Sequence, residues 1–333
     1  MTTDRVRWGI LGVAGIATRQ VIPAMLQGRY TAIHAVASRD HAKAVAAANQ
    51  FGIPRAYGSY DELLADQHVD AVYIPLPNQL HVPWSLRAID AGKHVLCEKP
   101  IGLNTAEAVQ LVSAAGRHPR LKVMEAFMYR LHPQWQRAKT LVADGAIGPV
   151  RAVHTWFSYF NVDPQNVRNI KEWGGGALMD IGCYGISVAR FLAGEPRRVS
   201  ARMDFDPRFG TDRVTSAILD CGDAAGTFTC ATQIARRQRV DIGGADGTIE
   251  IEIPFNAPID RPCRIFLQRG QQVEPITFDV CNQYTIQGDA FSVAILRDTD
   301  VPTSLDDAVA NMRVIDAIVE SAARSTWVDV PSC

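Results

Sequence analysis

The sequence predicts an α/β protein in which an N-terminal doubly wound parallel sheet of the Rossmann type is followed by a C-terminal α+β domain with an open, mostly antiparallel sheet. Up to about residue 128, short apolar runs alternate strictly with Ala-rich amphipathic stretches, a pattern typical of strands and helices in a doubly wound sheet. After residue 148 a series of neighbouring β-like runs follows, which favours a mostly antiparallel sheet with one covered face. The 333 residues are also too many for one ordinary core. We therefore expect two domains, residues 1–128 and 129–333.

The elements of the first domain follow from these patterns. The apolar runs are expected to be parallel strands buried on both faces, and they cover residues 6–11, 32–37, 71–75, 94–97 and 122–125. The intervening stretches carry apolar residues at a spacing of three to four, as amphipathic helices do. They cover residues 16–26, 40–51, 79–91 and 105–115.

The second domain is expected to begin with a helix at residues 133–143. Strands are then expected at residues 150–160, 199–204, 215–219, 226–233, 239–242 and 248–253. Helices over residues 179–192 and 306–323, and a further one near residues 289–296, are expected to cover one face of that sheet.

Composition excludes several classes of protein. A formal net charge of −1 leaves no basic excess for nucleic acid, and no stretch approaches the roughly 20 uninterrupted apolar residues of a membrane span. The polar, basic start of the chain lacks a signal-peptide pattern, so we expect a cytoplasmic protein. The seven cysteines show no metal-binding spacing, which predicts reduced thiols and no metal site.

A dinucleotide-binding fingerprint follows the first expected strand. Its form is G-x-A-x-x-A, and the candidate cofactor-binding residues are Gly12, Ala14, Gly15, Ile16 and Ala17. Gly12 suits the tight turn and Ala17 the close packing of helix on strand, whereas Ala14 stands where a second glycine usually lets the backbone approach the pyrophosphate. Gly15 is interpreted as restoring backbone freedom. The alternative is an ordinary glycine-containing turn.

The second expected strand ends at Ser38 and Arg39, where an NAD enzyme would place an acidic residue for the ribose hydroxyl. Arg39 can bind a 2′-phosphate through charge-assisted hydrogen bonds and Ser38 can add a donor, so NADP is favoured over NAD. Asp40 is interpreted as the N-cap of the next helix.

The third motif is the loop that follows the strand at residues 71–75. Pro75, Leu76, Asn78 and His81 are candidate cofactor contacts, because the carboxyl ends of parallel strands border the ligand site in such sheets. A rigid turn with a helix cap is the alternative.

Glu98-Lys99-Pro100 after the next strand, the fingerprint, and the run Gly174-Gly175-Gly176-Ala177-Leu178-Met179-Asp180-Ile181-Gly182-Cys183-Tyr184 together resemble the Gfo/Idh/MocA oxidoreductase family over essentially the whole chain. The resemblance implies a nicotinamide cofactor, contacts from residues 98–100, a catalytic Lys99, and a C-terminal sheet that often forms the subunit interface. Tyr184 replaces the His of many members. Tyr184 and the segment of residues 124–134 together resemble one branch of the family. This branch contains glucose-fructose oxidoreductase, dimeric dihydrodiol dehydrogenase, NADP-dependent xylose dehydrogenases and deoxysugar 3-ketoreductases.

The chemistry of alcohol oxidation accounts for three candidate catalytic residues, Lys99, Asp180 and Tyr184. A hydride acceptor needs a partner that takes the hydroxyl proton, and a phenol near an ammonium can do this because the cation favours phenolate. Asp180 and Tyr184 are four apart and so share one face of the expected helix. Alternatively, Asp180 is only a helix-start carboxylate, with residues 174–176 as a flexible entry, and Tyr184 only a buried aromatic.

The candidate substrate contacts are polar or aromatic residues near the expected domain junction or in loops: Arg130, His132, Arg168, Asn169, Trp173 and Tyr284. Each has a structural alternative: an ion pair for Arg130, a role in the fold for His132, and an N-cap segment around Tyr284.

These observations predict an NADP-dependent sugar or polyol oxidoreductase, such as an aldose 1-dehydrogenase. Reduction of keto- or anhydro-sugars, dihydrodiol oxidation and a non-catalytic NADP-binding redox sensor stay open. The expected partners are a small carbohydrate substrate and further copies of the chain, as a homodimer or homotetramer through the C-terminal sheet, with neither nucleic acid nor membrane.

Overall fold

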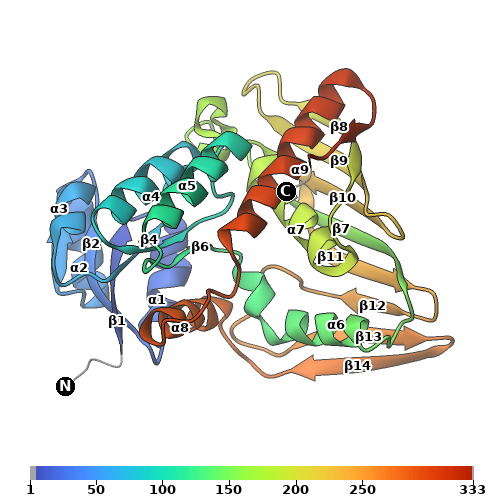
Figure 1. Cartoon of the computed structure of the whole chain (residues 1–333), viewed down its shortest axis with the longest axis horizontal. Helices are drawn as coiled ribbons and strands as arrows, with labels where there is room; N and C mark the ends of the chain where they lie inside the picture. Colours follow the sequence, from blue (N-terminus) through green and yellow to red (C-terminus); the bar gives the residue numbers. More distant parts are fainter. Residues whose placement is uncertain (1–4, 332–333) are drawn as a thin grey trace. The chain divides into compact units, whose positions relative to one another are not determined.

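The chain folds into two compact units in this computed structural model, which describes residues 5–331 (Figure 1). The first unit ends at Met128 and also contains Asn282–Val309. The second consists of Tyr129–Cys281 and the chain from Ala310 onward. A division at residue 128 alone assigns residues 282–309 to the second domain, whereas in the structure they belong to the first unit.

The core of the first unit is a six-stranded parallel sheet with the strand order β3-β2-β1-β4-β5-β6. This is the order of a Rossmann fold, so the predicted doubly wound sheet is confirmed. The two central strands, β1 and β4, are almost wholly buried, as apolar runs covered on both faces should be. The strands are β1 (Val6–Leu11), β2 (Thr31–Ala37), β3 (Arg55–Tyr57), β4 (Ala71–Ile74), β5 (His94–Cys97) and β6 (Val123–Glu125).

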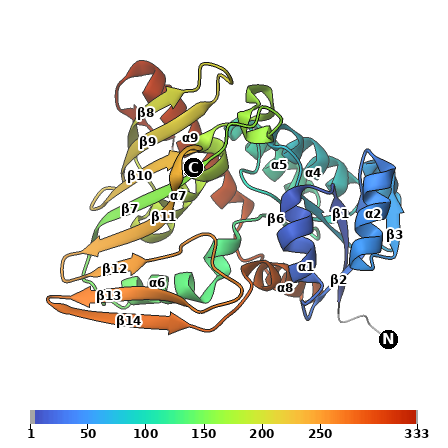
Figure 2. The same cartoon turned by 180° about the vertical axis from the view of Figure 1, so that it is seen from behind.

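Helices cover both faces of this sheet. Figure 1 shows α4 and α5 in front of the strands, and Figure 2, seen from behind, shows α1 and α2 in front. The expected helices are present, with ends that differ by at most a few residues. They are η1 (Ala17–Val21), α1 (Ile22–Met25), α2 (His41–Phe51), η2 (Asn78–Leu80), α4 (His81–Asp90) and α5 (Thr105–Arg117).

Strand β3 and helix α3 (Tyr60–Ala65) were not predicted from the sequence. Both are too short to show a periodic pattern of apolar residues. Ser59 caps α3 with its side chain. Helix α3 then packs so closely on β1 that a Cβ at Gly9 would come within 2.5 Å of Leu63 Cδ2.

Helix α8 (Gln283–Leu296) packs on the first unit, so the expectation that a helix near residues 289–296 covers the C-terminal sheet is wrong. Its partners are α1, β1 and β2. Asp289 accepts hydrogen bonds from the backbone N–H groups of Arg29 and Tyr30 at 3.0 and 2.8 Å. These bonds stabilise the turn before β2 and tie α8 to it.

The second unit contains a nine-stranded sheet with the order β14-β13-β12-β11-β7-β10-β9-β8-β15. Of its neighbouring strand pairs, β7 and β10 are parallel and the others are antiparallel, which confirms the mostly antiparallel sheet. The strands are β7 (Val150–Phe160), β8 (Arg198–Phe205), β9 (Asp212–Asp220), β10 (Ala225–Ala231), β11 (Gln233–Gly244), β12 (Thr248–Ile251), β13 (Cys263–Arg269), β14 (Gln272–Phe278) and β15 (Val328–Asp329).

Strands β13, β14 and β15 were not predicted. Strand β14 is an edge strand whose residues are mostly exposed, so it lacks the alternation of apolar and polar residues that marks a half-buried strand. Its Pro275 is tolerated because an edge strand leaves one side of its backbone unpaired.

Helices α6 (Pro133–Ala143) and α7 (Cys183–Ala193) pack against one side of this sheet, together with the C-terminal part of α9 (Leu305–Arg324). Figure 2 shows the opposite side, with the strands in front of these helices. The helical stretch Lys171–Ala193 has the length and apolar composition of a membrane span, with a mean hydropathy of 1.2. However, 83% of its apolar window is buried inside the protein, as in a core helix.

The described cysteines, Cys97, Cys183, Cys221, Cys230, Cys263 and Cys281, are free thiols, and Cys333 lies outside the described residues. Within residues 5–331, no cluster of three or more His, Cys, Asp or Glu side chains could hold a metal ion.

Candidate cofactor and active site

The turn after β1 has the geometry of a dinucleotide-binding loop. Gly12 has a φ of 118°, a conformation that favours glycine, and donates its N–H to Ala37 O at 2.9 Å. Residues 14–16 are partly or fully exposed, while Ala17 is fully buried where the helix begins. Gly15 lacks a positive φ, so the interpretation that it supplies backbone freedom is wrong.

The end of β2 presents an exposed guanidinium beside a buried hydroxyl. Ser38 Oγ accepts a hydrogen bond from the Asp40 N–H at 3.2 Å. Asp40 itself accepts from the Ala42 N–H at 3.1 Å, which confirms it as the N-cap of α2. Arg39 is exposed and forms a hydrogen bond with the hydroxyl of Tyr60, lowering the phenol pKa against the larger upward effect of burial. Because Asp40 caps the helix, this arrangement fits a 2′-phosphate better than a bare ribose.

His81 joins two loops at the carboxyl edge of the parallel sheet. Its Nδ1 lies 2.7 Å from Pro100 O, and its Nε2 lies 2.7 Å from Leu76 O. Burial lowers the pKa of His81 to about 4, whereas two carbonyl acceptors favour the imidazolium.

The loop between β4 and α4 borders the fingerprint turn. Pro75 directly follows β4, and Asn78 begins η2. A Cβ at Gly12 would come within 3.0 Å of Leu76 Cδ2. The structure therefore brings this loop, the turn after β1 and the Pro100 loop together at one edge of the sheet.

The segment Glu98-Lys99-Pro100 directly follows β5 at the same edge. The Tyr73 hydroxyl donates to Glu98 Oε1 at 2.6 Å, and the Ile101 N–H donates to Glu125 Oε1 at 2.7 Å. The Lys99–Pro100 peptide bond is cis. The Lys99 N–H itself donates to Glu98 Oε2 at 3.4 Å, so the carboxylates of Glu98 and Glu125 hold the backbone at Lys99 and at Ile101.

Tyr284 belongs to the first unit, although the predicted division placed it in the substrate-binding domain. Asn282 caps α8 by accepting a hydrogen bond from the Tyr284 N–H at 3.0 Å. Burial, and then the negative charge of Glu98, raise the pKa of the Tyr284 phenol. The Tyr284 phenol is thus close enough to Glu98, the residue before Lys99, for the carboxylate charge to affect its pKa.

In the second unit, Asp180 and Tyr184 come from one helical stretch and face the same strand. Asp180 lies in η6 (Leu178–Gly182), a π-helical turn of the kind that recurs at functional sites. Its Oδ2 accepts from the Tyr159 hydroxyl at 2.6 Å, and the ring of Tyr184 lies 5.6 Å from that of Phe157. Since Phe157 and Tyr159 are two apart on β7, they share a face. Asp180 and Tyr184 therefore share the side of the helix that contacts this strand.

Asp180 is held by two donors on one oxygen. In addition to Tyr159, Arg168 Nε donates to Oδ2 at 2.8 Å. Asp180 is only 9% exposed, whereas the Arg168 side chain is 41% exposed. Burial, and then the charge of Asp180, raise the pKa of Tyr159, so this phenol stays protonated and donates.

The loop before η6 is tightly packed. Asn169 is buried and donates to Asn161 Oδ1 at 3.0 Å, closing the loop on itself, while Trp173 is 37% exposed. A Cβ at Gly175 would come within 2.5 Å of Arg168 O. The glycines at 175 and 176 thus allow close packing, and the flexible entry at residues 174–176 stays an untested alternative. Substrate contacts by Arg168, Asn169 and Trp173 stay predictions.

Arg130 and His132 have partners within the second unit. The buried Arg130 guanidinium donates to Ser187 Oγ at 2.8 Å. His132 caps α6, because its Nδ1 accepts from the Gln134 N–H at 3.2 Å, and its Nε2 lies 3.2 Å from Cys281 Sγ. Burial lowers the pKa of His132 to about 4. For these two residues also, contact with a substrate stays a prediction.

Three residues of this arrangement were missed by sequence reasoning: Tyr60, Tyr73 and Tyr159. The tyrosines lie in strands or at a helix start, where apolar patterning indicates burial but does not name the partner of a hydroxyl.

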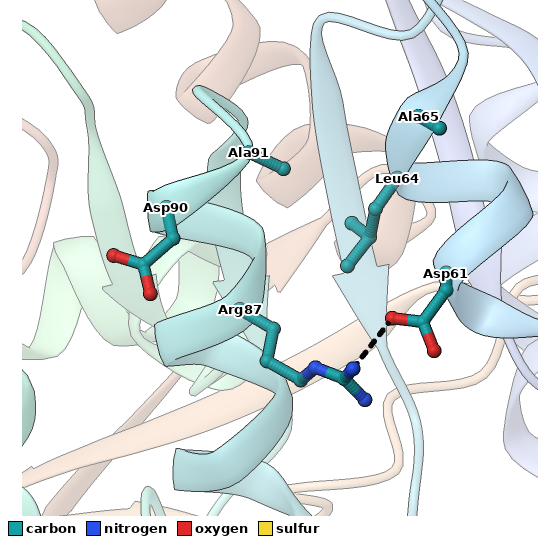
Figure 3. Close-up of a pocket in the computed structure, with 6 residues that line it drawn as sticks. All are labelled: Asp61, Leu64, Ala65, Arg87, Asp90 and Ala91. Atoms are coloured by element: carbon teal, nitrogen blue, oxygen red, sulfur yellow. Dashed lines mark ion pairs between the residues drawn. The ribbon is translucent and has the colours of Figure 1, made fainter.

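A shallow hollow of about 310 Å³ lies elsewhere on the first unit (Figure 3). It is lined by Asp61, Leu64, Ala65, Arg87, Asp90 and Ala91. Figure 3 shows Arg87 reaching across it toward Asp61, with 3.0 Å between Nη2 and Oδ1. None of the predicted site residues lines this hollow.

Comparison with known proteins identifies the family. A family model described as an oxidoreductase family with an NAD-binding Rossmann fold matches residues 6–127, and the Gfo/Idh/MocA C-terminal domain matches residues 135–250. The D-xylose 1-dehydrogenase (NADP(+)) 2 of Haloferax volcanii is 38% identical over 328 residues, 97% of this chain and 99% of that protein.

Solved structures agree. An aldose-aldose oxidoreductase from Caulobacter crescentus has a TM-score of 0.90 and 31% identity, covering 98% of this chain and 99% of that one. KijD10, a 3-ketoreductase from Actinomadura kijaniata in complex with NADP and TDP-benzene, has a TM-score of 0.90 and 29% identity over 96% and 98% of the two chains. The chain belongs to the Gfo/Idh/MocA oxidoreductase family, as the motifs around Lys99 and Tyr184 predict.

Proposed function

We propose that this protein is an NADP-dependent oxidoreductase that transfers a hydride between the nicotinamide and a carbinol or carbonyl carbon of a sugar or polyol, as an aldose 1-dehydrogenase does. The observation that carries the proposal is Lys99 at the carboxyl edge of the parallel sheet, on a backbone whose N–H groups at Lys99 and Ile101 donate to Glu98 and Glu125. The names of two similar proteins, the xylose dehydrogenase and the 3-ketoreductase, support a sugar substrate and NADP.

The residues at the sheet edge fit a dinucleotide. The turn at Gly12 leaves no room for a Cβ beside Leu76 and has exposed backbone at residues 14–16. Exposed Arg39, held by Tyr60, offers a planar cation for a 2′-phosphate. When bound, the nicotinamide would supply the hydride acceptor or donor.

In this proposal, Tyr184 transfers the proton of the substrate hydroxyl, because a phenol can act as acid or base at hydrogen-bond distance from a carbinol oxygen. Lys99 favours the phenolate form of Tyr184 through its positive charge and orients the same hydroxyl. Asp180, fixed by Tyr159 and Arg168, holds the substrate or the lysine.

The test is a spectrophotometric screen of aldoses, polyols and keto-sugars with NADP and NAD in parallel, followed by Lys99→Ala and Tyr184→Phe. Both variants should keep NADP binding and lose about 100-fold or more of the turnover, the usual contribution of acid-base catalysis. Tyr57→Phe is the matched control, because it removes a phenol that donates to Asp66 and keeps the Tyr57 carbonyl that accepts from the Ser38 N–H. Full activity in both site variants, or no absorbance change with any substrate, would contradict the proposal, and the second result would favour a redox sensor.

We further propose that the protein works in the cytoplasm as a homodimer or homotetramer formed through the C-terminal sheet. The side of this sheet that faces away from α7 carries the exposed side chain of Ile218, whose neighbours Ala217 and Leu219 are buried. Trp156, Ser216 and Thr229 lie on the same side in adjacent strands. Such a mixed, partly apolar surface suits contact with a second copy.

A further inference from the structure

Gly15 is a glycine without a conformational need for one. Its φ is not in the left-handed region, and it enters a helix, where glycine costs about 0.5–1 kcal/mol relative to alanine. What fills the space of the missing side chain is Arg19. A Cβ at Gly15 would lie 2.8 Å from Arg19 Nη2, 3.3 Å from Nε and 3.4 Å from Cζ. The Arg19 guanidinium therefore packs against Gly15 of the fingerprint turn, which lies four residues earlier in the chain.

This location is unfavourable for a cation in the protein alone. The N-terminal end of a helix carries positive partial charge, which disfavours an arginine by a few tenths of a kcal/mol or more. Arg19 is exposed, and within the part of the chain that the structure describes it forms no ion pair with a carboxylate. The position becomes favourable when an anion binds at the turn.

The fingerprint itself supplies a reason for such a cation. Ala14 replaces the glycine that usually lets the backbone approach the pyrophosphate, and its Cβ keeps an anion farther from the backbone N–H groups. A guanidinium reaches across a longer gap than a backbone N–H and binds phosphate oxygens with two donors.

We infer that Arg19 is a ligand of the cofactor pyrophosphate, with Gly15 as the residue that makes room for it. The inference rests on the proposed function and divides the recognition between two arginines. Arg39 reads the 2′-phosphate, which only NADP has. Arg19 reads the pyrophosphate, which NAD and NADP share.

Small fragments of the cofactor separate the two roles. ADP contains the pyrophosphate without a 2′-phosphate, and adenosine 2′-monophosphate contains the 2′-phosphate without a pyrophosphate. Dissociation constants of the full-length protein for NADP, NAD and both fragments are measured by calorimetry. Arg19→Gln should weaken NADP, NAD and ADP by the same factor, about 10-fold, as loss of a charge-assisted hydrogen bond does. It should leave adenosine 2′-monophosphate within about twofold. Arg39→Gln should weaken NADP and adenosine 2′-monophosphate, and should leave NAD and ADP within about twofold.

Gly15→Ala provides a second measurement, because its methyl group displaces only the end of a flexible side chain. It should weaken ADP about as much as Arg19→Gln does, and the double variant should be no weaker than either single one. Gln20→Ala, the exposed neighbour, is the control and should bind like the wild type.

Unchanged ADP affinity in Arg19→Gln, or equal weakening of adenosine 2′-monophosphate, would overturn the inference. If the wild-type protein oxidises or reduces sugars and the Arg19→Gln variant binds all four ligands as the wild type does, the proposed function stands and only the role of Arg19 is refuted. A wild-type protein that binds neither cofactor removes both.

Discussion

Replacing Tyr159 by phenylalanine removes one hydroxyl and leaves the ring of β7 in place. The lost bond is the 2.6 Å donation to Asp180 Oδ2, while the bond from Arg168 to this oxygen, at 2.8 Å, is kept. Arg168 holds the carboxylate less rigidly than Tyr159 does, because its side chain is 41% exposed and comes from the short 3₁₀ helix η4 (Val167–Asn169). We therefore expect Asp180 to lose its fixed orientation in this variant.

The size of the effect follows from the type of bond. A hydrogen bond to a charged group contributes about 1.5–3 kcal/mol net, and each 1.36 kcal/mol in a barrier changes a rate tenfold. If Asp180 must be held in place for the reaction, Tyr159→Phe should lower kcat by about 10- to 100-fold. The KM for NADP should stay unchanged, because the cofactor motifs lie in the other unit. Initial rates with the best sugar of the screen measure the loss of kcat, and urea unfolding measures the loss of stability.

Tyr57→Phe is the matched control for this experiment. It removes the same kind of bond, a phenol that donates to Asp66 Oδ2 at 2.9 Å, from a site that holds none of the catalytic candidates. Both variants should lose stability, and only Tyr159→Phe should lose kcat. A Tyr159→Phe enzyme with wild-type kcat and a stability loss like that of the control would refute the positioning role and leave the bond merely structural.

Two further predictions concern stability and assembly. The Nδ1 atoms of His94 and His132 each accept a hydrogen bond from a backbone N–H, and burial lowers the pKa of each ring from 6.5 to about 4. Below pH 6.5 the unfolded chain therefore binds more protons than the folded protein. The free energy of unfolding should fall as the pH drops from 6.5 toward 4. The loss is at most about 3 kcal/mol per histidine. His94→Asn should flatten this slope in urea titrations, and exposed His118→Asn should not. Ile218→Asp should reduce the mass by light scattering to the 36.5 kDa of one chain, whereas Val45→Asp on α2 should keep the assembly. An unchanged slope or mass would contradict the respective prediction.

The parallel sheet could be predicted because five of its six strands, β1, β2, β4, β5 and β6, are mostly buried apolar runs, and the longer helices between them have one apolar side. Such patterns are local, whereas the strand order comes from the structure, because doubly wound sheets occur with more than one order. The placement of α8 could not be predicted in this way. It depends on Asp289, whose carboxylate reaches N–H groups about 260 residues earlier in the chain. No periodicity within the helix reports such a partner.

The glycines show a similar limit. The sequence indicates that residues 174–176 and Gly15 lie at unusual backbone, and glycine invites an interpretation as flexibility. In the structure, Gly175 and Gly15 are places where something else comes close, a carbonyl in one case and a guanidinium in the other. Which of the two meanings applies depends on the atoms that fold against the glycine, and these belong to other segments.

The charged residues of the proposed site were found as motifs, while the groups that hold them were not. Arg39, Glu98 and Asp180 each form a hydrogen bond with a tyrosine hydroxyl, from Tyr60, Tyr73 and Tyr159 respectively. A phenol suits this task because it can accept from a guanidinium or donate to a carboxylate, and because its rigid ring loses little rotamer freedom when the bond forms. It also adds no charge of its own, so the motif residue keeps its full electrostatic effect on a ligand. Strand register and helix packing determine which tyrosine lies beside each motif residue, and the motif sequence predicts neither of them. Charged sequence motifs therefore indicate the residues proposed to contact the ligand, but they do not indicate the neutral tyrosines that orient those residues.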